Sequence, residues 1–270
     1  MTDSRELESG PSIEHSGPGW RVAHSDCIRF LKSLPDESVD IITTDPAYSG
    51  MNQHLSFGEG RIVGRYQNNE ANERWFEEFH DTPENYSAFL GECHRVMRRD
   101  RHIYLMFDSF SLLTLGPLIR EKFDVKCLIV WDKVNLGMGH YFRRRHEHVV
   151  FACKGKRPLS RRDIPDVWSI KRLSSAPYPT QKPVEVFSAM LRGSVEPGFT
   201  VCDPFAGSGS SAIAALRAGC SFVGCDISER AVSLTAERCS AFVERGVDIH
   251  QPRSAVDGQI KMRFLTEAAD

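Results

Sequence analysis

Four consecutive residues, Asp45-Pro46-Ala47-Tyr48, combine an acid, a rigid turn and an aromatic ring directly after the apolar run 41–44. Such a strip is suited to chemistry on the exocyclic amine of adenine or cytosine, a poor nucleophile whose lone pair is delocalised into the ring. Asp45 is placed to accept a hydrogen bond from one amino hydrogen, and the carbonyl of Pro46 or Ala47 from the other. Tyr48 would stack on the base, which must be flipped out of the duplex. The alternative is an ordinary turn, since Asp-Pro is common at strand ends.

A second group of candidate residues lies in the run 203–209 (Asp-Pro-Phe-Ala-Gly-Ser-Gly), between an apolar strand and a helical pattern. Its glycines allow a tight turn and a close approach of the backbone to a ligand, and amides at the helix N-terminus face the bound group. Asp226 ends the next strand, 17 residues beyond Gly209, where an acid can accept hydrogen bonds from ribose hydroxyls. The pattern predicts a nucleoside cofactor. The alternative is a turn that needs glycine for packing alone.

Two features of this turn favour S-adenosylmethionine over a dinucleotide. Ala212 stands where a dinucleotide turn usually has its third glycine. Asp203 would repel a pyrophosphate, whereas it could help to hold a methionine ammonium group.

Short apolar runs alternate with helical patterns, which predicts an α/β fold with a mostly parallel sheet and helices on both faces. The predicted strands are Trp20–His24, Val39–Thr44, His102–Phe107, Val125–Trp131, Glu147–Cys153, Thr200–Cys202 and Ser221–Cys225. One helix is predicted to start at the Thr82-Pro83-Glu84 signal. Further helices are predicted over Val184–Leu191, Ser208–Ala218 and Ser228–Val243.

We expect one α/β domain over residues 19–245, between a flexible tail (1–18) and a C-terminal tail (246–270). Two excursions interrupt the domain: a lid over 49–81 and a short irregular region over 154–178. No apolar run reaches the length needed to span a bilayer, and the N-terminus resembles no signal peptide, so we expect a cytoplasmic protein without membrane contact. The eight cysteines form no Cys-x-x-Cys pair, which argues against a metal site.

The net charge of −2 gives no support for a polyanionic partner, but the local distribution of charge does. Residues 143–172 contain ten Lys and Arg against three acids. Such a stretch can form a nucleic-acid face, or it can be a solvated loop. Arg143, Arg144 and Arg145 are the candidates for phosphate contact, and Arg61 and Arg65 in the lid are further nucleic-acid candidates.

Together these segments resemble the β-class of N6-adenine and N4-cytosine DNA methyltransferases, in which the catalytic strip precedes the cofactor turn. The resemblance covers residues 19–243 and also rests on 26–27, 34–40, 131–133, 137–139, 145–147 and 179–183. It implies a Rossmann-like methyltransferase fold with a doubly wound, mostly parallel seven-stranded sheet, one antiparallel strand and a circularly permuted motif order. Dimers are frequent in that family, so a homodimer stays an open alternative to a monomer.

The resemblance also assigns roles to individual residues. The catalytic strip would be Asp45, Pro46, Ala47 and Tyr48. The residues implied for S-adenosylmethionine are Asp26, Cys27, Asp45, Thr180, Lys182, Asp203, Phe205, Ala206, Gly207, Ser208, Gly209, Asp226 and Ile227. The implied activity is site-specific transfer of a methyl group to N6 of a flipped-out adenine in DNA, of the kind found in restriction-modification systems.

Three departures from the family pattern bear on that implication. Ala47 stands where a second proline is usual, which keeps a backbone carbonyl but gives a less rigid loop. Tyr178 replaces the usual histidine before the segment 179–183. The region 154–178 is short for a target-recognition domain, so recognition would use the lid, a partner subunit or little sequence readout.

Adenine is the preferred base because an aspartate begins the strip, whereas cytosine enzymes of this family more often begin it with serine. N4 of cytosine is the alternative. An RNA substrate, a non-catalytic nucleic-acid-binding subunit and a dinucleotide-dependent oxidoreductase are further alternatives. Binding of S-adenosylmethionine rather than NAD, seen as a rise in melting temperature, would separate the last of these.

Overall fold

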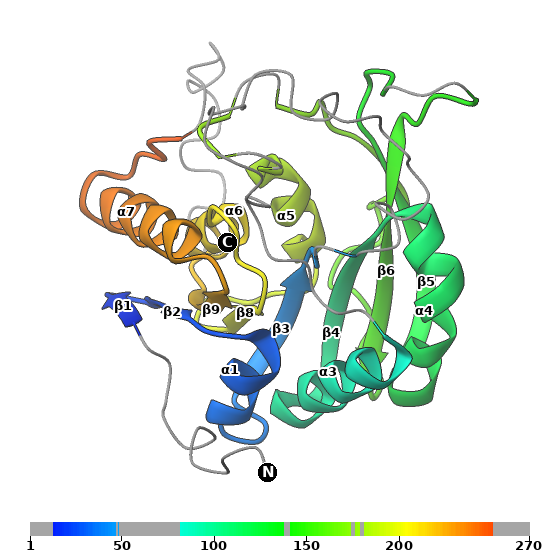
Figure 1. The fold of residues 1–270 in the computed structure, drawn as a ribbon, viewed down its shortest axis with the longest axis horizontal. Helices are drawn as coiled ribbons and strands as arrows, with labels where there is room; N and C mark the ends of the chain where they lie inside the picture. Colours follow the sequence, from blue (N-terminus) through cyan, green and yellow to red (C-terminus); the bar gives the residue numbers. More distant parts are fainter. Residues whose placement is uncertain are drawn as a thin grey trace, which may run out of the picture.

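A nine-stranded sheet in the order β1-β2-β9-β8-β3-β4-β6-β5-β7 forms the centre of the protein (Figure 1). The structure is a computed structural model that describes residues 13–46, 48, 82–137, 141–173, 176–178 and 181–250. The strands are β1 (Ile13–Gly17), β2 (Trp20–His24), β3 (Val39–Thr44), β4 (Met97–Phe107), β5 (Asp124–Asp132), β6 (His146–Lys154), β7 (Val167–Ser169), β8 (Thr200–Asp203) and β9 (Ser221–Asp226). Strand β1 is antiparallel to β2, and β6 is antiparallel to both β4 and β5. The other pairs are parallel.

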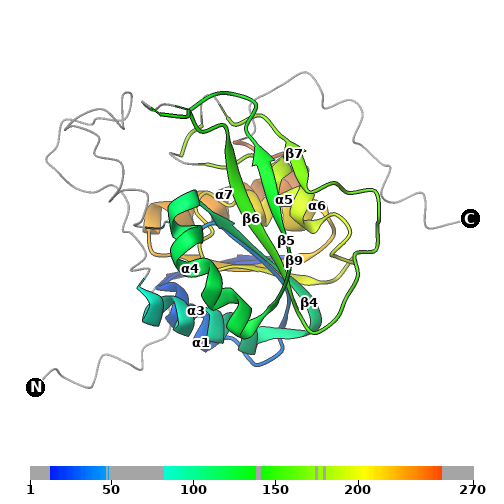
Figure 2. The same cartoon turned by 90° about the vertical axis from the view of Figure 1, so that its right-hand side faces the viewer.

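Helices cover both faces of this sheet, as Figure 2 shows from the side. One face carries α1 (Cys27–Ser33), α3 (Pro83–Val96) and α4 (Ser109–Lys122), and the other carries α5 (Val184–Leu191), α6 (Ser210–Arg217) and α7 (Glu229–Arg245). Successive residues of a strand point to opposite faces, so Ile41 lies in the core beneath α5 and α6 while Ile42 lies in the core beneath α1 and α3. The predicted doubly wound α/β class is confirmed.

Helices α1, α3, α4 and α7 begin after a residue whose side chain caps the helix. Thr82 Oγ1 accepts a hydrogen bond from the Asn85 amide at 3.3 Å, and Pro83 occupies the first helical turn of α3. Ser228 caps α7 in the same way. Asp26 caps α1 and Asp108 caps α4, two helices that the sequence patterns did not predict. For α1, α4 and α7 the capping residue lies within two residues of the end of the preceding strand.

A buried acid at the start of β3 fixes three central strands to one another. Asp40 accepts hydrogen bonds from Arg98 at 2.7 Å, from Arg101 at 2.9 Å and from the Thr200 amide at 2.9 Å. Burial acts to raise the pKa of Asp40, but these donors outweigh it and lower the pKa below its usual value. The charged clamp holds the amino ends of β3, β4 and β8 together, at the sheet edge opposite the functional residues described below.

The structure differs from several predicted boundaries. Residues 13–17, predicted as part of a flexible tail, form the edge strand β1, and the predicted irregular region 154–178 contains β7. These two short strands bring the sheet to nine strands instead of seven, and β1 adds a second antiparallel strand. At the other end, Asp248 is buried and binds Arg238 of α7. Residues 246–250 therefore belong to the folded unit and not to a tail.

Candidate active site

Three acids stand at the carboxyl ends of neighbouring strands. Asp45 follows β3, Asp203 ends β8 and Asp226 ends β9, and these strands are adjacent and parallel. Thr44 Oγ1 donates a hydrogen bond to Asp203 Oδ1 at 2.8 Å, which links the ends of β3 and β8 directly. Ligands bind at such an edge in open α/β sheets, so the two predicted motifs meet in one place.

Asp203 is buried and fully engaged with the protein. Its Oδ1 accepts from Thr44 Oγ1 and from the Phe205 amide at 3.0 Å, and its Oδ2 accepts from Ser211 Oγ at 2.5 Å. Burial raises the pKa of Asp203 to about 7, against the lowering effect of these donors. The acid therefore holds the turn after β8 in shape, and a contact with a methionine ammonium would come in addition to this role.

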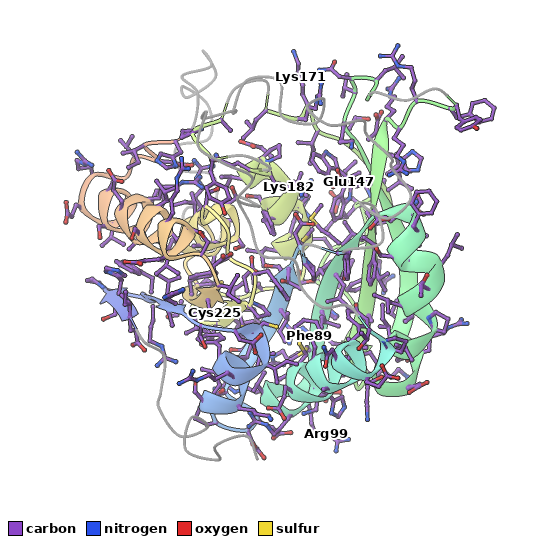
Figure 3. The ribbon with its side chains drawn as sticks, viewed as in Figure 1. Phe89, Arg99, Glu147, Lys171, Lys182 and Cys225 are labelled. Atoms are coloured by element: carbon purple, nitrogen blue, oxygen red, sulfur yellow. The ribbon has the colours of Figure 1, made fainter. Side chains whose placement is uncertain are left out.

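Asp45 forms an ion pair with Lys182, which lies just before α5. Lys182 Nζ also lies 3.9 Å from Glu147 Oε2, and Glu147 Oε1 lies 3.0 Å from Lys133 Nζ. Figure 3 shows Lys182 and Glu147 side by side, arriving from opposite sides of the site. Acid and base thus alternate along a network of four side chains, and Asp45 is its member on the catalytic strip.

The charged groups in this network shift one another's pKa values. Burial raises the pKa of Asp45, while Lys182 opposes that shift. Burial acts to lower the pKa of Lys182, but the charges of Asp45 and Glu147 outweigh it and raise the pKa above its usual value. The pKa of Glu147 is lowered, because Lys182 and Lys133 together outweigh its burial. Lys182 therefore carries a positive charge beside Asp45 at neutral pH.

The aromatic ring of the strip lies against the protein. Tyr48 is buried, and its ring stacks on Phe107 with centroids 4.7 Å apart and 13° between planes. Its hydroxyl lies 3.4 Å from the hydroxyl of Tyr86, and its amide donates to the Pro46 carbonyl at 3.0 Å. Phe107 thus covers one ring face, so a base would use the opposite face. Ala47 lies outside the described residues.

The glycine turn after β8 provides an open backbone surface. Gly207 has a φ of 53°, and a Cβ added there would meet no atom of the described residues within 4 Å. At Gly209 (φ 82°) an added Cβ would lie 2.8 Å from Thr235 Oγ1, so close packing against α7 requires the glycine. The two glycines therefore have different roles. Gly207 leaves the turn open on one side, and Gly209 allows the turn to pack closely against α7.

Asp226 lies beside this open surface. Its Oδ2 accepts from the Gly207 amide at 2.8 Å and its Oδ1 from the Ser228 amide at 2.9 Å. Burial raises its pKa, against the effect of these amides. Ile227 is 43% exposed, and its carbonyl lies 2.8 Å from His24 Nε2. Asp226 and Ile227 thus stand where they were predicted, at the end of β9.

The remaining predicted cofactor residues are distributed around the same edge. Asp26 caps α1 through its Oδ1, and Cys27 is buried behind it. Phe205 contacts Phe89 edge-on, with ring centroids 5.6 Å apart. Ala206 and Ser208 are buried within the turn. Thr180 lies outside the described residues.

A nucleoside cofactor with a methionine tail fits the chemistry of this edge. The turn offers open space at Gly207, Asp226 offers carboxylate oxygens and Lys182 offers a cation. The side-chain oxygen of Gln181, next to Lys182, is buried and lacks a hydrogen-bond partner among the residues that the structure describes. A bound polar group could donate the hydrogen bond that this oxygen lacks.

The arginines that were predicted to bind nucleic acid differ in their contacts within the protein. Arg145 binds Asp132 through two hydrogen bonds of 2.6 and 2.7 Å, so its guanidinium is engaged within the protein. Arg143 donates to the Gly137 carbonyl at 2.8 Å, and Arg144 lies 4.9 Å from the centre of the Phe110 ring. Arg61 and Arg65 lie outside the described residues.

Two residues of the ionic network were not predicted as site residues. Lys133 and Glu147 lie in segments that carried the family resemblance; Glu147 begins one predicted strand, and Lys133 lies two residues after the end of another. That position was the available signal for Lys133 and Glu147. Their approach to Asp45 depends on the antiparallel pairing of β5 with β6, which places Glu147 opposite Trp131.

Two other kinds of feature do not occur in the described part of the chain. None of its helices is both long enough and apolar enough to cross a membrane. Within the same residues, no cluster of three or more His, Cys, Asp or Glu side chains is arranged to hold a metal ion.

A doubly wound sheet with acids at the carboxyl ends of its central strands is an arrangement in which ligands bind at that edge, and comparison with known proteins identifies the family. The sequence profile of the DNA methylase family matches residues 39–237. The chain therefore belongs to the N6/N4 DNA methylase family, and the predicted resemblance to these S-adenosylmethionine-dependent enzymes is confirmed.

Individual relatives agree with this assignment. The type II methyltransferase M.HhaII of Haemophilus parahaemolyticus is 30% identical over 208 residues, which span 74% of this chain and 87% of that one. The TTHA0409 protein of Thermus thermophilus, solved with S-adenosyl-L-methionine, is 20% identical, with a TM-score of 0.59 over 82% of this chain and 95% of that one. The cytosine-N4-specific PvuII DNA methyltransferase is 16% identical, with a TM-score of 0.60 over 85% and 88%. The structural likenesses establish the fold.

Proposed function

We propose that this protein transfers a methyl group from S-adenosylmethionine to the N6 amine of an adenine that is flipped out of DNA. The observation that carries the proposal is the meeting of Asp45, paired with Lys182, with the open glycine turn and Asp226 at one sheet edge. A catalytic acceptor and a cofactor site then lie next to one another, as methyl transfer requires.

The cofactor would be held by the residues that line this edge. Asp226 would accept hydrogen bonds from the ribose hydroxyls, the backbone at Gly207 would lie close to the ligand, and Lys182 would pair with the methionine carboxylate. Bound S-adenosylmethionine supplies an activated methyl group on its sulfonium centre. The support for these roles is the geometry of the turn and the orphaned Gln181 oxygen.

Asp45 would act on the base. Its carboxylate accepts a hydrogen bond from the amine, which favours a tetrahedral nitrogen with an available lone pair, and it receives the proton that the methylated nitrogen loses. The Pro46 carbonyl is a candidate second acceptor, although it already accepts from the Tyr48 amide. Lys182 would keep Asp45 ionised until the amine arrives, since an adjacent cation stabilises the charged form.

Adenine is preferred because an aspartate begins the catalytic strip. The cytosine-N4 specificity of PvuII, a protein of similar fold, supports N4 of cytosine as the second candidate. RNA as substrate and a non-catalytic subunit are the remaining alternatives. The cytoplasmic location and the homodimer stay predictions.

The proposal is tested by incubating the protein with S-adenosylmethionine carrying a labelled methyl group and with duplex or single-stranded DNA, followed by nucleoside analysis. We expect labelled N6-methyladenine from the wild type and none from Asp45→Ala. Asp124→Ala, which removes an exposed acid elsewhere, should remain active. N4-methylcytosine would transfer the proposal to its second candidate.

Cofactor binding, measured by calorimetry, separates the other outcomes. Asp45→Ala should bind S-adenosylmethionine within a few-fold of the wild type, because its predicted role is in chemistry. Product from Asp45→Ala would remove Asp45 from the mechanism. Cofactor binding by the wild type without any DNA product would favour RNA or a non-catalytic subunit.

A further inference from the structure

Two aromatic side chains are fully exposed on the connection between β5 and β6. We call the described residues 133–137 and 141–145 of this connection the β5–β6 arm. Within it Tyr141 is 94% exposed and Phe142 is 103% exposed. Two adjacent rings that both lie in solvent cost hydrophobic free energy, and such exposure marks surfaces that bind a partner. Figures 1 and 2 show the arm projecting away from the body of the protein.

The base of the arm is rigid. Asp132 binds Arg145 across the two stems and also accepts from the Val134 amide at 2.8 Å. The Lys133 amide donates to the Arg145 carbonyl at 2.8 Å, and the Gly137 amide donates to the Arg144 carbonyl at 2.7 Å. These bonds impose a left-handed conformation on Val134 (φ 67°), which is costly for a β-branched residue. The stems are therefore fixed, and the rings are presented from a built support.

The positive charge of the arm is complementary to that of a polyanion. In the basic stretch 143–172, Arg145, Lys154, Arg157 and Arg161 are paired with acids. Arg143 and Arg144 contact a carbonyl oxygen and an aromatic ring instead, so these contacts leave their charge unneutralised. Aromatic rings next to arginines are the combination that binds nucleic acid with accessible bases, through stacking and phosphate contact.

The arm stands at the catalytic edge of the sheet. It leaves β5 at the carboxyl end, and its first residue, Lys133, binds Glu147, which contacts Lys182, the partner of Asp45. A partner that covers the rings would therefore lie beside the site where the base is to be methylated.

We propose that Tyr141 and Phe142 stack on bases of DNA next to the target nucleotide, while Arg143 and Arg144 contact the adjoining phosphates. This inference rests on the proposed function, because it names the residues that would hold its substrate. A second copy of this chain, covering the rings in a dimer, is the outcome that would overturn it.

Hydroxyl-radical footprinting read by mass spectrometry tests the contact directly. In the free protein Tyr141 and Phe142 are expected to be oxidised readily, and duplex DNA of about 30 base pairs should protect both rings. Leu113, which is 80% exposed on α4, serves as the control and should stay unprotected. Rings that remain as reactive with saturating DNA as without it would overturn the proposal.

Variants then separate stacking from charge. Replacing both rings (Tyr141→Ala with Phe142→Ala) should weaken DNA binding about tenfold or more, whereas Tyr141→Trp with Phe142→Trp should retain it. The aromatic variants should leave the salt dependence of binding unchanged, and Arg143→Ala with Arg144→Ala should flatten it. Leu113→Ala should bind as the wild type does. An affinity of the double alanine variant within twofold of the wild type would contradict the proposal.

Two further measurements distinguish the remaining outcomes. Sedimentation of the free protein would reveal a dimer that dissociates when both rings are replaced, which would assign the rings to a self-contact and overturn the inference. Methyl transfer is assayed in parallel. Protection of the rings without any methylated product would refute the proposed function and leave the arm as a DNA contact. Methylated product without protection of the rings would support the proposed function and refute the DNA contact of the arm.

Discussion

Burial and the neighbouring Lys182 cation have opposite effects on the pKa of the Asp45 carboxylate. Burial raises its pKa, Lys182 opposes the rise, and Glu147 competes for the same lysine. Asp45 can take up the proton that the methylated amine loses only while its carboxylate is ionised, and the ionised form also accepts the stronger hydrogen bond. The pH at which this protein is active should therefore depend on Lys182 as much as on Asp45.

We expect Lys182→Met to move the acidic limb of the pH–activity profile upward, by about one to three pH units. Without Lys182, burial and Glu147 raise the pKa of Asp45 against the smaller opposing effect of Lys133, so a higher pH is needed to ionise it. Lys133→Met is the matched control, because Lys133 contacts Glu147 and not Asp45, and its shift should be smaller. The profile of kcat at saturating cofactor provides the measurement. Equal shifts in the two variants would contradict the role assigned to Lys182.

Helix α7 supports the glycine turn through a buried ion pair. The Arg238 guanidinium binds Asp248 through two hydrogen bonds of 2.9 and 2.7 Å and also donates to the Ser208 carbonyl within the turn. Both side chains are fully buried. The segment after α7 is thereby connected to the backbone predicted to hold the cofactor.

Asp248→Ala should lower the free energy of unfolding by about 3–5 kcal/mol, because it leaves the Arg238 charge buried without its partner. Glu14→Ala removes one member of an exposed ion pair, Arg21 with Glu14, and should cost less than about 1 kcal/mol. Denaturant unfolding at neutral pH compares the two variants. A cost for Asp248→Ala no larger than that for Glu14→Ala would show that the pair does not stabilise the fold.

Long buried strands and the cofactor turn could be predicted from the sequence, because apolar runs and glycine spacing report directly on burial and backbone shape. All seven predicted strands form, and β2, β3 and α5 have the predicted bounds. The edge strand β1 is mostly exposed and so carries no apolar alternation, and β7 has three residues. These strands exist because a neighbour pairs with them, which local sequence does not record.

The helices and the site likewise combine features that the local sequence predicts with features that depend on tertiary structure. α4 contains Pro117, a residue that usually ends a helix, and Asp26 could be read as a ligand contact as readily as a helix cap. Asp45, Asp203 and Asp226 stand at the predicted strand ends. The ionic network around Asp45 was not predicted, since Glu147 reaches it only through the antiparallel register of β6.

At the scale of the whole molecule, Asp203 couples stability to pH. Its pKa, raised to about 7 by burial, means that the folded state disfavours the ionised form. The contribution of Asp203 to stability is therefore fully present below the usual pKa of an aspartate and is lost as the pH rises through about 7.

Asp203→Asn removes this titration while keeping the shape of the side chain. Between pH 5 and pH 8, the free energy of unfolding of the variant should improve relative to that of the wild type by about 3 kcal/mol. Denaturant unfolding at several pH values measures the difference, with Asp124→Asn as a control for the loss of an exposed acid. A difference that stays constant over this pH range would show that Asp203 does not titrate there.

The antiparallel direction of β6 has a consequence for how such proteins diversify. Because β6 runs against β4 and β5, the chain leaves and re-enters the sheet at one edge without a crossover helix. The connection between β5 and β6 can therefore be lengthened, shortened or replaced while the strands that carry Asp45, Asp203 and Asp226 keep their pairing. Under the role proposed for the β5–β6 arm, changes in DNA contact and changes in the reacting groups would then fall on separate parts of one chain.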